Sequence, residues 1–486
     1  MILERGLHLG GRDVPAADGR TTADLDPHTG EVYATVAAGG PADVRRAVEA
    51  AVAAFPAWSA MPPSSRRRIA LKAADVLEAR VDEAVAVMAD EVGGVAGWAR
   101  FNVALAAGIL REAAAAATRP VGDVLTTEVD GRLSLAVREP VGVVAAFAPW
   151  NAPVILGTRA IATPLAVGNT VVLKPSEDAP IASGLFLADV LREAGLPDGV
   201  LNVVTNDRAD AAAVAEALIA DDRVRAVDFT GSTRVGRIIG ELAARHLKPA
   251  VLELGGKNAV LVLDDADLDH AVDAVAFGGF TNAGQICMSA DRVLVHDSIA
   301  EEFTARLAAK VARLPHGDPA DPATVVGPVI DPRSARRVAD LVADAVERGA
   351  RVRAGGGEPN GSAYPATVLD RVTPAMRVHH EEVFGPVVTV IAVADDEEAI
   401  ALANDTEYGL TAGVLTEDTR RGLAVARRLR TGIVHVGNQT VDDEPQAPFG
   451  GVRASDYGRF GGRWGVEAFT TTRWVTIAGT PTQFPF

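Results

Sequence analysis

From Val141 onward, short runs of β-branched and apolar residues recur along the chain at intervals of about 25 to 30 residues. These runs are 141–147, 170–173, 200–204, 225–229 and 250–254. Segments with helical or mixed patterning lie between some of them, at 183–194 and 209–220. Strands that alternate with helices in this way are typical of parallel βαβ units. The pattern therefore predicts a doubly wound parallel sheet with helices on both faces.

A second alternation of strands and helices follows Cys287. Its expected strands lie near 291–295, 387–393 and 432–436. Its expected helices lie near 298–313, 333–348 and 416–430. The two alternations predict two α/β domains, and a chain of 486 residues exceeds the size at which a single core stops growing. Ligands often bind where domains meet, so we expect the chemistry near the segment that joins the two alternations.

The residues before the first alternation are predicted to be largely helical. Pro41 suits the first turn of a helix, and Val44 and Val48 then fall on one face of it. Ser64 is a candidate cap for a longer helix that continues to about Met88. No internal repeat interrupts this organisation, and the only compositional bias is a general enrichment in alanine.

Composition and charge narrow the classes of function. Hydrophobic residues make up 48% of the chain and charged residues 23%, which is an ordinary globular balance. The formal net charge of −17 argues against nucleic acid or an anionic membrane as the main partner, because both require a cationic surface. The N-terminus shows no basic and apolar leader, and no apolar run reaches about eighteen residues. We expect a soluble cytoplasmic protein.

The single cysteine of the chain, Cys287, is the strongest candidate for chemistry. It lies in the run Gly-Gln-Ile-Cys-Met-Ser at 284–289, downstream of Glu-Leu-Gly-Gly-Lys at 253–257. A lone cysteine cannot form an intramolecular disulfide, and most isolated cysteines are small buried hydrophobic residues rather than nucleophiles. On residue type alone, both interpretations stay open.

Two strand ends carry groups suited to a nucleotide. The run Phe-Thr-Gly-Ser-Thr-Arg-Val-Gly at 229–236 joins a strand to an expected helix that reaches Arg245. Glycines at such a turn let backbone N–H groups approach an anion, although a plain turn explains the run equally well. At the end of another strand, Lys174 and Glu177 could bind ribose hydroxyls or form an ordinary charge pair. Neither a G-x-G-x-x-G fingerprint nor a P-loop occurs in the chain.

A third strand end, Pro-Trp-Asn-Ala-Pro at 149–153, offers a donor for a negatively charged oxygen. The amide of Asn151 can donate a hydrogen bond to an oxyanion as it develops, and Trp150 can form a rigid wall beside it. By itself this run means little. It gains weight only beside a nucleophile.

Taken together, these motifs resemble those of the NAD(P)-dependent aldehyde dehydrogenases. The matching runs span nearly the whole chain and lie at 26–31, 149–151, 174–177, 229–232, 253–257, 284–287, 381–386, 404–410 and 448–451. Motifs in this number and order favour the nucleophile interpretation of Cys287. A narrower similarity, to the vanillin, salicylaldehyde and benzaldehyde dehydrogenase branch, rests on 148–162, 287–289, 379–382 and 457–462.

The resemblance implies roles for individual residues. Cys287 would be the nucleophile, Asn151 would hold the oxyanion together with the backbone N–H of Cys287, and Glu253 would activate water. The residues expected to bind NAD, with NADP as the alternative, are Trp150, Lys174, Ser176, Glu177, Thr230, Gly231, Ser232, Val235, Gly236, Leu254, Gly255, Glu382 and Phe384. Glu177 favours NAD, because a carboxylate beside the 2′ position repels a phosphate.

The resemblance also implies the aldehyde dehydrogenase fold, which is two doubly wound α/β domains plus a small β element for oligomerisation. The cofactor-binding domain is expected over 1–121 and 140–254, and the catalytic domain over 255–465. A hairpin at 122–139 and the tail at 466–486, with a strand near 470–478, would form the oligomerisation element. A homodimer or homotetramer is therefore expected.

Two segments depart from the family pattern. Asp456 stands where the family has a glycine that can need a positive φ, a region that aspartate tolerates better than most residues. The loop 437–444 ends in Val-Asp-Asp-Glu, whereas the branch usually has a histidine after the valine, and this loop is expected to border the aldehyde tunnel. Acidic residues there would repel anionic aldehydes.

The stretch 148–162 with Met288 predicts an apolar wall without a fixed cation, so an aromatic aldehyde is the expected substrate.

Other functions are weighed beside this one. The alternatives are an aliphatic aldehyde or semialdehyde dehydrogenase, a coenzyme-A-acylating relative, which would lack the base at Glu253, and a non-enzymatic structural relative. A non-enzymatic relative would not need a thiol, a base and an amide together.

No metal site is expected, because adjacent residues such as His379 and His380 should point apart.

Overall fold

The apolar runs of the first alternation form the middle of an eight-stranded sheet in the computed structural model, which describes residues 2–119, 121–479 and 484–486. In spatial order its strands are β20 (Asp456–Tyr457), β12 (Ala250–Glu253), β11 (Val224–Thr230), β8 (Val143–Ala148), β9 (Thr170–Pro175), β10 (Leu201–Val203), β2 (Leu7–Leu9) and β3 (Arg12–Val14). The strands from β12 to β10 are parallel, and β20, β2 and β3 pair antiparallel at the two edges. The predicted parallel sheet is confirmed in this central part.

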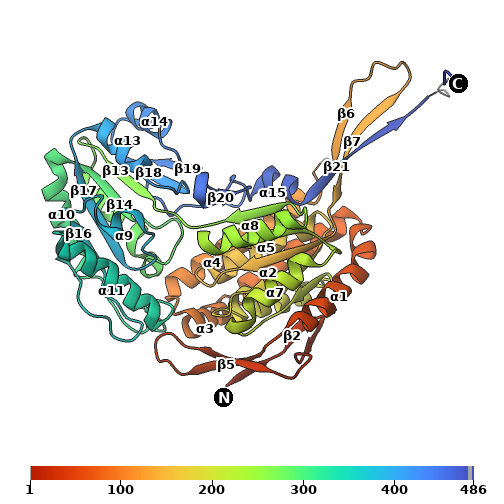
Figure 1. Ribbon diagram of the computed structural model, residues 1–486, viewed down its shortest axis with the longest axis horizontal. Coiled ribbons are helices and arrows are strands. Elements are labelled where there is room, and N and C mark those ends of the chain that lie inside the picture. The colour runs from red at the N-terminus through yellow and green to blue at the C-terminus, as the bar shows by residue number, and fades with distance from the viewer. Residues whose placement is uncertain (1, 120, 480–483) are drawn as a thin grey trace.

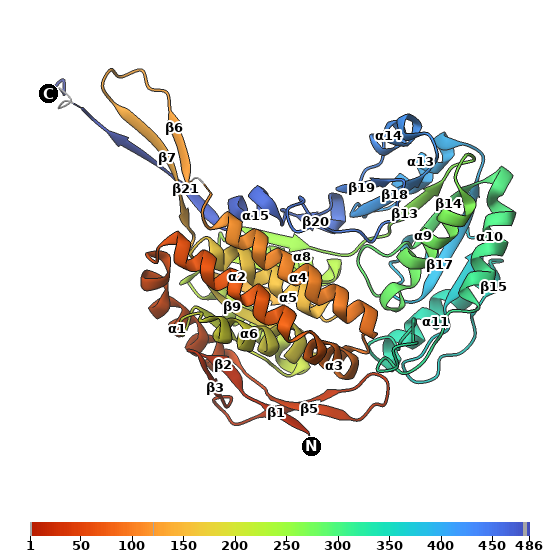
Figure 2. The ribbon, with the colours of Figure 1, turned by 180° about the vertical axis from the view of Figure 1, so that it is seen from behind.

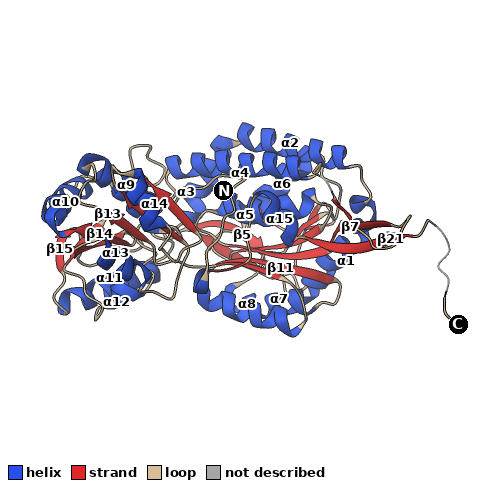
Figure 3. Cartoon of the chain, turned by 90° about the horizontal axis from the view of Figure 1, so that it is seen from above, coloured by secondary structure: helices blue, strands red, loops and turns tan. Residues whose placement is uncertain are grey.

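Burial on both faces explains why these strands read as continuous apolar runs. Along β8, Val144 and Ala146 pack into the core on one side of the sheet, and Val143 and Phe147 pack on the other. The first side is covered by α2 (Pro63–Ala79), α3 (Val81–Val92), α4 (Ala96–Ala116), α5 (Pro153–Ala166) and α6 (Phe186–Ala194). The second side is covered by α1 (Pro41–Ser59), α7 (Ala211–Ala220) and α8 (Thr233–Arg245). Figure 3 shows α2, α4 and α6 on one side of the strands and α7 and α8 on the other.

The second alternation forms a seven-stranded sheet in a smaller lobe, on the left of Figure 1. In spatial order its strands are β15 (Arg351–Ala354), β16 (Thr367–Asp370), β17 (Val387–Val393), β14 (Arg292–His296), β13 (Ala259–Val262), β18 (Thr411–Leu415) and β19 (Ile433–Val436). All pair in parallel except β15. One face packs against α9 (Leu268–Phe280) and α10 (Asp297–Val311), and the other against α11 (Pro332–Glu347), α13 (Asp396–Asn404) and α14 (Thr419–Ala426).

The remaining helices are short. They are α12 (Arg377–His380), α15 (Gly462–Ala468), a π-helical turn at Ile181–Leu185 and 3-10 turns at Arg208–Asp210, Thr281–Gly284 and Arg453–Ser455. None of the helices within the described ranges is long and apolar enough to cross a membrane.

The helix expected from Ser64 to about Met88 is two helices, so that prediction is wrong. The first helix begins at Pro63, one residue before Ser64, and ends at Ala79. Arg80 leaves the helical conformation with φ −101° and ψ 22°, and its guanidinium donates a hydrogen bond to Glu83 at 2.8 Å. The second helix can therefore turn away at Arg80. Figure 2 shows α2, α4 and α5 lying side by side over the sheet.

Strands rather than helices occupy the residues before Pro41. The strands β2 and β3 of the eight-stranded sheet lie in this segment. Three further strands form a small separate sheet, in the order β1 (Leu3–Arg5), β5 (Val32–Ala37) and β4 (Thr21–Leu25). The sequence prediction also overlooked β13, β16 and β18, because periodicity cannot distinguish short apolar strands from buried helices. The strand β13 positions the site: the chain leaves the first sheet after Glu253 and enters the second at Ala259, so residues 254–258 cross between the two lobes.

A three-stranded antiparallel arm projects from the larger lobe (Figures 1 and 2). It contains β6 (Gly122–Leu125), β7 (Leu133–Pro140) and β21 (Thr470–Ile477), and β21 pairs with β7 along its whole length. Trp474 is 71% exposed on this arm. The strands expected at 122–139 and near 470–478 lie here, whereas residues 480–483 of the expected tail lie outside the described residues. Its part in oligomerisation stays a prediction.

Candidate active site

Cys287 lies in the loop that joins α9 to β14, beside the carboxyl ends of the first sheet. Gly284 anchors this loop with φ 69°, and a Cβ at that position would stand 2.1 Å from the carbonyl oxygen of Gly385. No side chain fits such a gap, so glycine is required at this turn. The thiol that follows is half-buried.

Asn151 connects the end of β8 to the cysteine loop. Its side-chain amide donates a hydrogen bond to the backbone carbonyl of Gln285 at 2.9 Å, two residues before Cys287. The backbone carbonyl of Asn151 accepts hydrogen bonds from the Trp98 indole at 3.1 Å and from the side-chain amide of Asn282 at 2.9 Å. The buried amide is therefore held in place from both lobes, close to the thiol.

Glu253 ends β12 and is 3% exposed. Neither of its carboxylate oxygens has a hydrogen-bond partner among the described residues. Burial raises the pKa of Glu253 well above its ordinary value, and the neighbouring carboxylate of Asp456 raises it further. A carboxyl group in this state suits a general base that works near neutral pH.

The thiol of Cys287 is difficult to ionise. Burial raises its pKa to about 12, and the nearby Glu382 and Glu253 carboxylates add to the effect. At neutral pH the resting group is therefore the thiol rather than the thiolate.

Cys287 lines a small pocket of about 30 Å³. Its lining is mostly apolar and aromatic and consists of Trp98, Phe101, Leu105, Asn151, Ala152, Ile155, Leu156, Arg159, Ile286, Cys287, Met288, Val441, Asp442, Asp443 and Phe449. The rings of Trp98 and Phe101 stack at 5.5 Å between centroids, and Phe101 is 41% exposed. A ring-sized ligand requires side chains of the pocket to move, and Phe101 is the exposed ring among them.

The sequence prediction missed Arg159, which lies in the lining of this pocket, and the expectation of a wall without a fixed cation is wrong. Its guanidinium forms a buried ion pair with Asp443 and lies 4.2 Å from the centroid of the Phe449 ring. The opposite charges of Arg159 and Asp443 cancel, and Asp442 adds one acidic group to the lining. The pocket therefore has no net attraction for an anion. The signal in the sequence was an isolated arginine inside the apolar helix α5.

A larger cavity of about 680 Å³ lies at the carboxyl ends of β8, β9 and β11 and at the N-terminus of α8. Its lining includes many of the residues expected to bind the cofactor, namely Trp150, Lys174, Ser176, Glu177, Thr230, Gly231, Ser232 and Val235. Ser232 caps α8, and its hydroxyl accepts a hydrogen bond from the N–H of Val235 at 3.4 Å. A helix N-terminus that opens into a cavity favours an anion such as a pyrophosphate.

The other expected cofactor residues lie outside the lining of this cavity and contact one another or a residue that lines it. A Cβ on Gly236 would stand 2.2 Å from Leu254, so glycine lets α8 approach the crossing segment. Glu382 accepts a hydrogen bond from the N–H of Gly256 at 2.9 Å, and a Cβ on Gly255 would stand 2.6 Å from the same carboxylate. In addition, the ring of Phe384 packs edge-on against Trp150 at 5.6 Å. The cofactor roles of these residues stay predictions.

Lys174 and Glu177 form the charge pair that the sequence left open, and the Asn206 amide donates to the same carboxylate at 3.1 Å. Burial alone would raise the pKa of Glu177, but the ammonium and the amide outweigh it and hold the pKa below its ordinary value. Glu177 is therefore ionised and able to accept from hydroxyl groups. This donor and acceptor set, with the helix N-terminus, fits the ribose and pyrophosphate of a dinucleotide.

Two further expectations need correction. His379 and His380 do not point apart: the structure brings a ligand atom of each, together with one of Asp405, within 4.8 Å of one another. The buried pair Lys257 and Arg292 places positive charge near His379, which disfavours a cation there. Asp456 does not use a positive φ, because it has φ −163° in the extended strand β20.

The profile described as the aldehyde dehydrogenase family matches residues 14–475, and the chain belongs to this family, whose members use NAD or NADP. The chain is 52% identical over 484 residues to a vanillin dehydrogenase of Pseudomonas fluorescens, with 100% of both chains covered. It is also 40% identical over 463 residues to a benzaldehyde dehydrogenase [NAD(+)] of Pseudomonas putida, with 95% of this chain and 94% of that protein covered.

A solved structure points the same way. A salicylaldehyde dehydrogenase from Pseudomonas putida G7 complexed with salicylaldehyde superimposes with a TM-score of 0.97 at 43% identity, covering 100% of both chains. The predicted fold class, enzyme class and similarity to the vanillin, salicylaldehyde and benzaldehyde branch are confirmed. The roles of the individual site residues are a separate question.

Proposed function

We propose that this protein oxidises aromatic aldehydes to carboxylic acids with NAD, through a covalent intermediate on Cys287. One observation carries the proposal: Cys287 lines a pocket whose walls include the rings of Trp98, Phe101 and Phe449. Flat apolar walls favour an aromatic ring. The three relatives described above are named for aromatic aldehydes, which supports the same substrate class.

The first step forms a bond between the sulfur of Cys287 and the aldehyde carbon. As the carbonyl double bond opens, its electron pair moves to oxygen, and the Asn151 amide stabilises the charge. An amide has two N–H groups, and one of them donates to Gln285, which leaves the other for the oxyanion. The thiol proton must leave first, and Glu382 is a nearby carboxylate able to accept it, which leaves Glu253 free for the later step with water.

The remaining steps oxidise the adduct and then release the acid. When bound, the nicotinamide of NAD supplies the hydride acceptor that turns the adduct into a thioester. Glu253 then takes a proton from water while the water oxygen attacks the thioester carbon, and the carbon–sulfur bond breaks with its electrons returning to sulfur. The raised pKa of Glu253 makes it a stronger base for this step than an ordinary carboxylate.

The larger cavity would hold the dinucleotide. Glu177 and Lys174 would bind the adenosine ribose, and the N-terminus of α8 at Ser232 would bind the pyrophosphate. An ionised Glu177 repels a 2′-phosphate, which favours NAD over NADP. Arg208 also lines the cavity, but its guanidinium is paired with Asp178, so it is less available to a phosphate.

A kinetic panel tests the substrate class and the cofactor together. We expect benzaldehyde, vanillin and salicylaldehyde to give higher kcat/KM than acetaldehyde or succinic semialdehyde, by about tenfold or more, because the pocket is apolar and has no uncompensated cation. Each aldehyde is measured with saturating NAD and then with NADP. A semialdehyde or short aliphatic aldehyde that outperforms benzaldehyde would contradict the aromatic assignment. A preference for NADP would contradict the role given to Glu177.

A further inference from the structure

A second carboxylate, Asp456, lies opposite the proposed base. The short strand β20 pairs antiparallel with β12 so that Asp456 and Glu253 are direct cross-strand partners. The side chains of such partners project to the same face, with Cβ atoms about 4.5 to 5.5 Å apart. Both side chains are buried. The register of the sheet edge therefore brings two acids together beside the active site.

Gly450 keeps open the space between these groups. It has φ 147°, and a Cβ built there would stand 2.2 Å from Oδ2 of Asp456 and 2.7 Å from Oε1 of Glu253. The same Cβ would stand 2.8 Å from Nη1 of Arg459. A side chain at this position would therefore collide with two carboxylates and one guanidinium, which come together beside the glycine.

From the described residues, hydrogen bonds reach one of the four carboxylate oxygens of this pair. Oδ2 of Asp456 accepts a hydrogen bond from the backbone N–H of Gly451 at 2.8 Å and lies 3.0 Å from Nη1 of Arg459. Oδ1 of Asp456 and both oxygens of Glu253 have no hydrogen-bond partner in the part of the chain that the structure describes. Buried, unpaired and like-charged oxygens are unfavourable, and a proton shared between the two groups relieves the repulsion.

Charged groups from other elements also face this pair. Arg159 on α5 opposes the charge of Glu253, as does Arg459 beyond β20. Asp228 on β11 projects to the same face of the sheet as Glu253, and the charge of Glu253 raises the pKa of the Cys287 thiol. Burial raises the pKa of Asp456 to about 6, against the lowering effect of its hydrogen bonds and of Arg459.

We propose that Asp456 and Glu253 form a carboxylate dyad with one shared proton, and that Asp456 is the positioning residue that sets the pH at which Glu253 becomes a free base. The inference rests on the proposed function, in which Glu253 activates water. As the pH rises, the shared proton leaves the pair for bulk solvent, and Glu253 is then free to take a proton from water. Asp456 therefore strengthens the base, because a group that loses its proton at higher pH also binds the proton of water more tightly.

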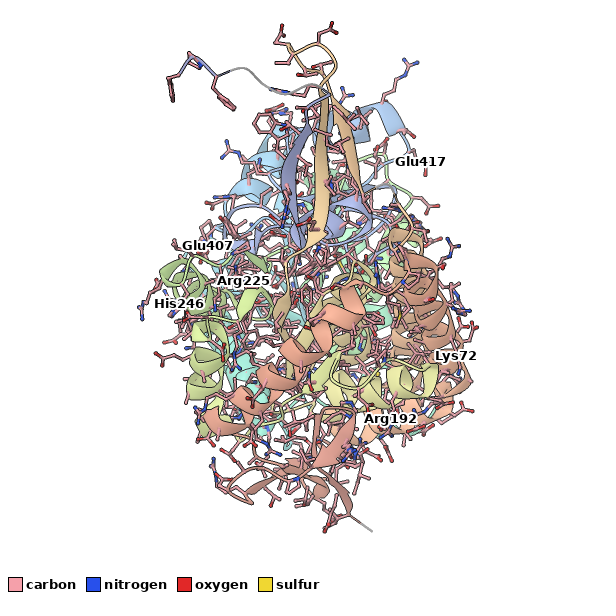
Figure 4. All side chains as sticks on the ribbon, turned by 90° about the vertical axis from the view of Figure 1, so that its right-hand side faces the viewer. Lys72, Arg192, Arg225, His246, Glu407 and Glu417 are labelled. Carbon is pink, nitrogen blue, oxygen red and sulfur yellow. The ribbon has the colours of Figure 1, made fainter. Side chains whose placement is uncertain are left out.

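Hydrolysis of 4-nitrophenyl benzoate without cofactor tests the dyad. The thiolate of Cys287 displaces 4-nitrophenolate and forms the benzoyl thioester, and water then hydrolyses that thioester with Glu253 as base. The first burst counts the intact active sites, and the slow phase measures water activation. Both are recorded between about pH 5 and pH 9 for the unmodified protein and for Asp456→Asn, Asp456→Gly and Arg459→Gln. The control is Glu417→Gln, which removes a carboxylate from the surface (Figure 4).

The dyad predicts shifts in opposite directions. The rate of the slow phase should fall at low pH, where Glu253 is protonated, and this part of the pH profile is its acid limb. The acid limb should move to lower pH by about one unit or more in both Asp456 variants. A shift of one unit corresponds to a tenfold change in proton binding by Glu253. It should move to higher pH in Arg459→Gln, because a positive charge that favours the ionised pair is lost. The control should keep the limb in place. Rates are divided by burst amplitude, so misfolded protein does not enter the comparison.

Two results would overturn the inference in distinguishable ways. If the burst persists but the limb stays in place, or moves in the same direction in the Asp456 and Arg459 variants, Asp456 has only a structural role. If the unmodified protein gives no burst, Cys287 does not form the acyl intermediate, and the proposed function fails together with the dyad.

Discussion

The side-chain amide of Asn151 donates a hydrogen bond to the backbone carbonyl of Gln285, at 2.9 Å. The two residues come from different lobes: Asn151 follows β8 of the eight-stranded sheet, and Gln285 belongs to the loop before β14 of the seven-stranded one. The bond fixes the amide beside the thiol and leaves one N–H unused. It therefore joins the two lobes at the point where the proposed chemistry takes place.

Replacement of Asn151 by alanine should lower kcat by about 10² to 10³, because one donor to the oxyanion is lost, a change of about 2.7 to 4 kcal/mol in the transition state. Binding of the cofactor should change little. Steady-state kinetics with benzaldehyde, together with a cofactor titration by fluorescence, check both expectations. An unchanged kcat would show that Asn151 only holds the cysteine loop.

Cys287→Ala should abolish dehydrogenase activity while the protein stays folded and binds NAD, because the thiol supplies the nucleophile and no cofactor contact. Thermal unfolding and NAD titration serve as controls for folding and for the cofactor site. Turnover retained by this variant would contradict the assignment of the nucleophile. Since the chain has a single cysteine, residual activity could not come from another thiol.

Glu253→Gln should give a burst of NADH close to one equivalent per active site, followed by a stall. The thioester forms before the step that needs a base, and glutamine keeps the volume but lacks the basicity of a carboxylate, so steady-state turnover should fall by about 10² to 10⁴. Rapid-mixing absorbance measures the burst, and mass spectrometry of the quenched protein should show the acyl adduct. A steady state equal to that of the unmodified enzyme would assign water activation to another group.

Glu177→Gln should raise kcat/KM with NADP relative to NAD by about tenfold or more, because a charge that repels the 2′-phosphate is removed. The same exchange at the exposed Glu193, outside the cofactor cavity, should leave the ratio unchanged. Initial rates at several concentrations of each dinucleotide give the ratio. If the ratio stays constant in Glu177→Gln, the preference for NAD has another origin.

Asp228→Asn should stabilise the protein, and the gain should grow with pH. Asp228 is fully buried on β11, and neither of its oxygens has a hydrogen-bond partner within the described ranges. Burial raises its pKa well above the ordinary value, so the folded state keeps a proton that the unfolded chain releases. Stability linked to this group is complete below the unfolded pKa and is lost progressively as pH rises above it.

Thermal unfolding of Asp228→Asn and of the unmodified protein at several pH values checks this prediction. The difference in Tm should be small near about pH 4, where the carboxyl is protonated in both states, and larger near about pH 8. A difference that does not depend on pH would mean that packing, and not proton linkage, accounts for the effect.

Local pattern was enough to place the chemistry on the chain. Parallel strands buried on both faces read as continuous apolar runs, so the sequence indicated where β8, β9, β11 and β12 end. Because carboxyl ends of parallel strands meet at one edge of a sheet, Asn151, Lys174 and Glu253 could be expected near one another. The family motifs then supplied their expected roles and the class of enzyme.

Sequence reasoning failed where an assignment depended on local conformation that pattern does not encode. The break at Arg80 leaves the apolar spacing on either side compatible with one helix. The short strand β13 could not be distinguished from its apolar surroundings. Adjacent histidines, His379 and His380, lie in a short helix rather than in a strand, which places their rings 4.6 Å apart.

The walls of the substrate pocket and the environment of the base were decided by tertiary structure alone. Arg159 meets Asp443 across 284 positions of sequence, and Asp456 reaches Glu253 only through the antiparallel register of β20 on β12. The sequence determined the fold, the family and the reactive groups, because these follow from local pattern and motif. Which charges neutralise one another, and which carboxylate faces the base, depend on the packing of distant segments, and local preferences do not specify it.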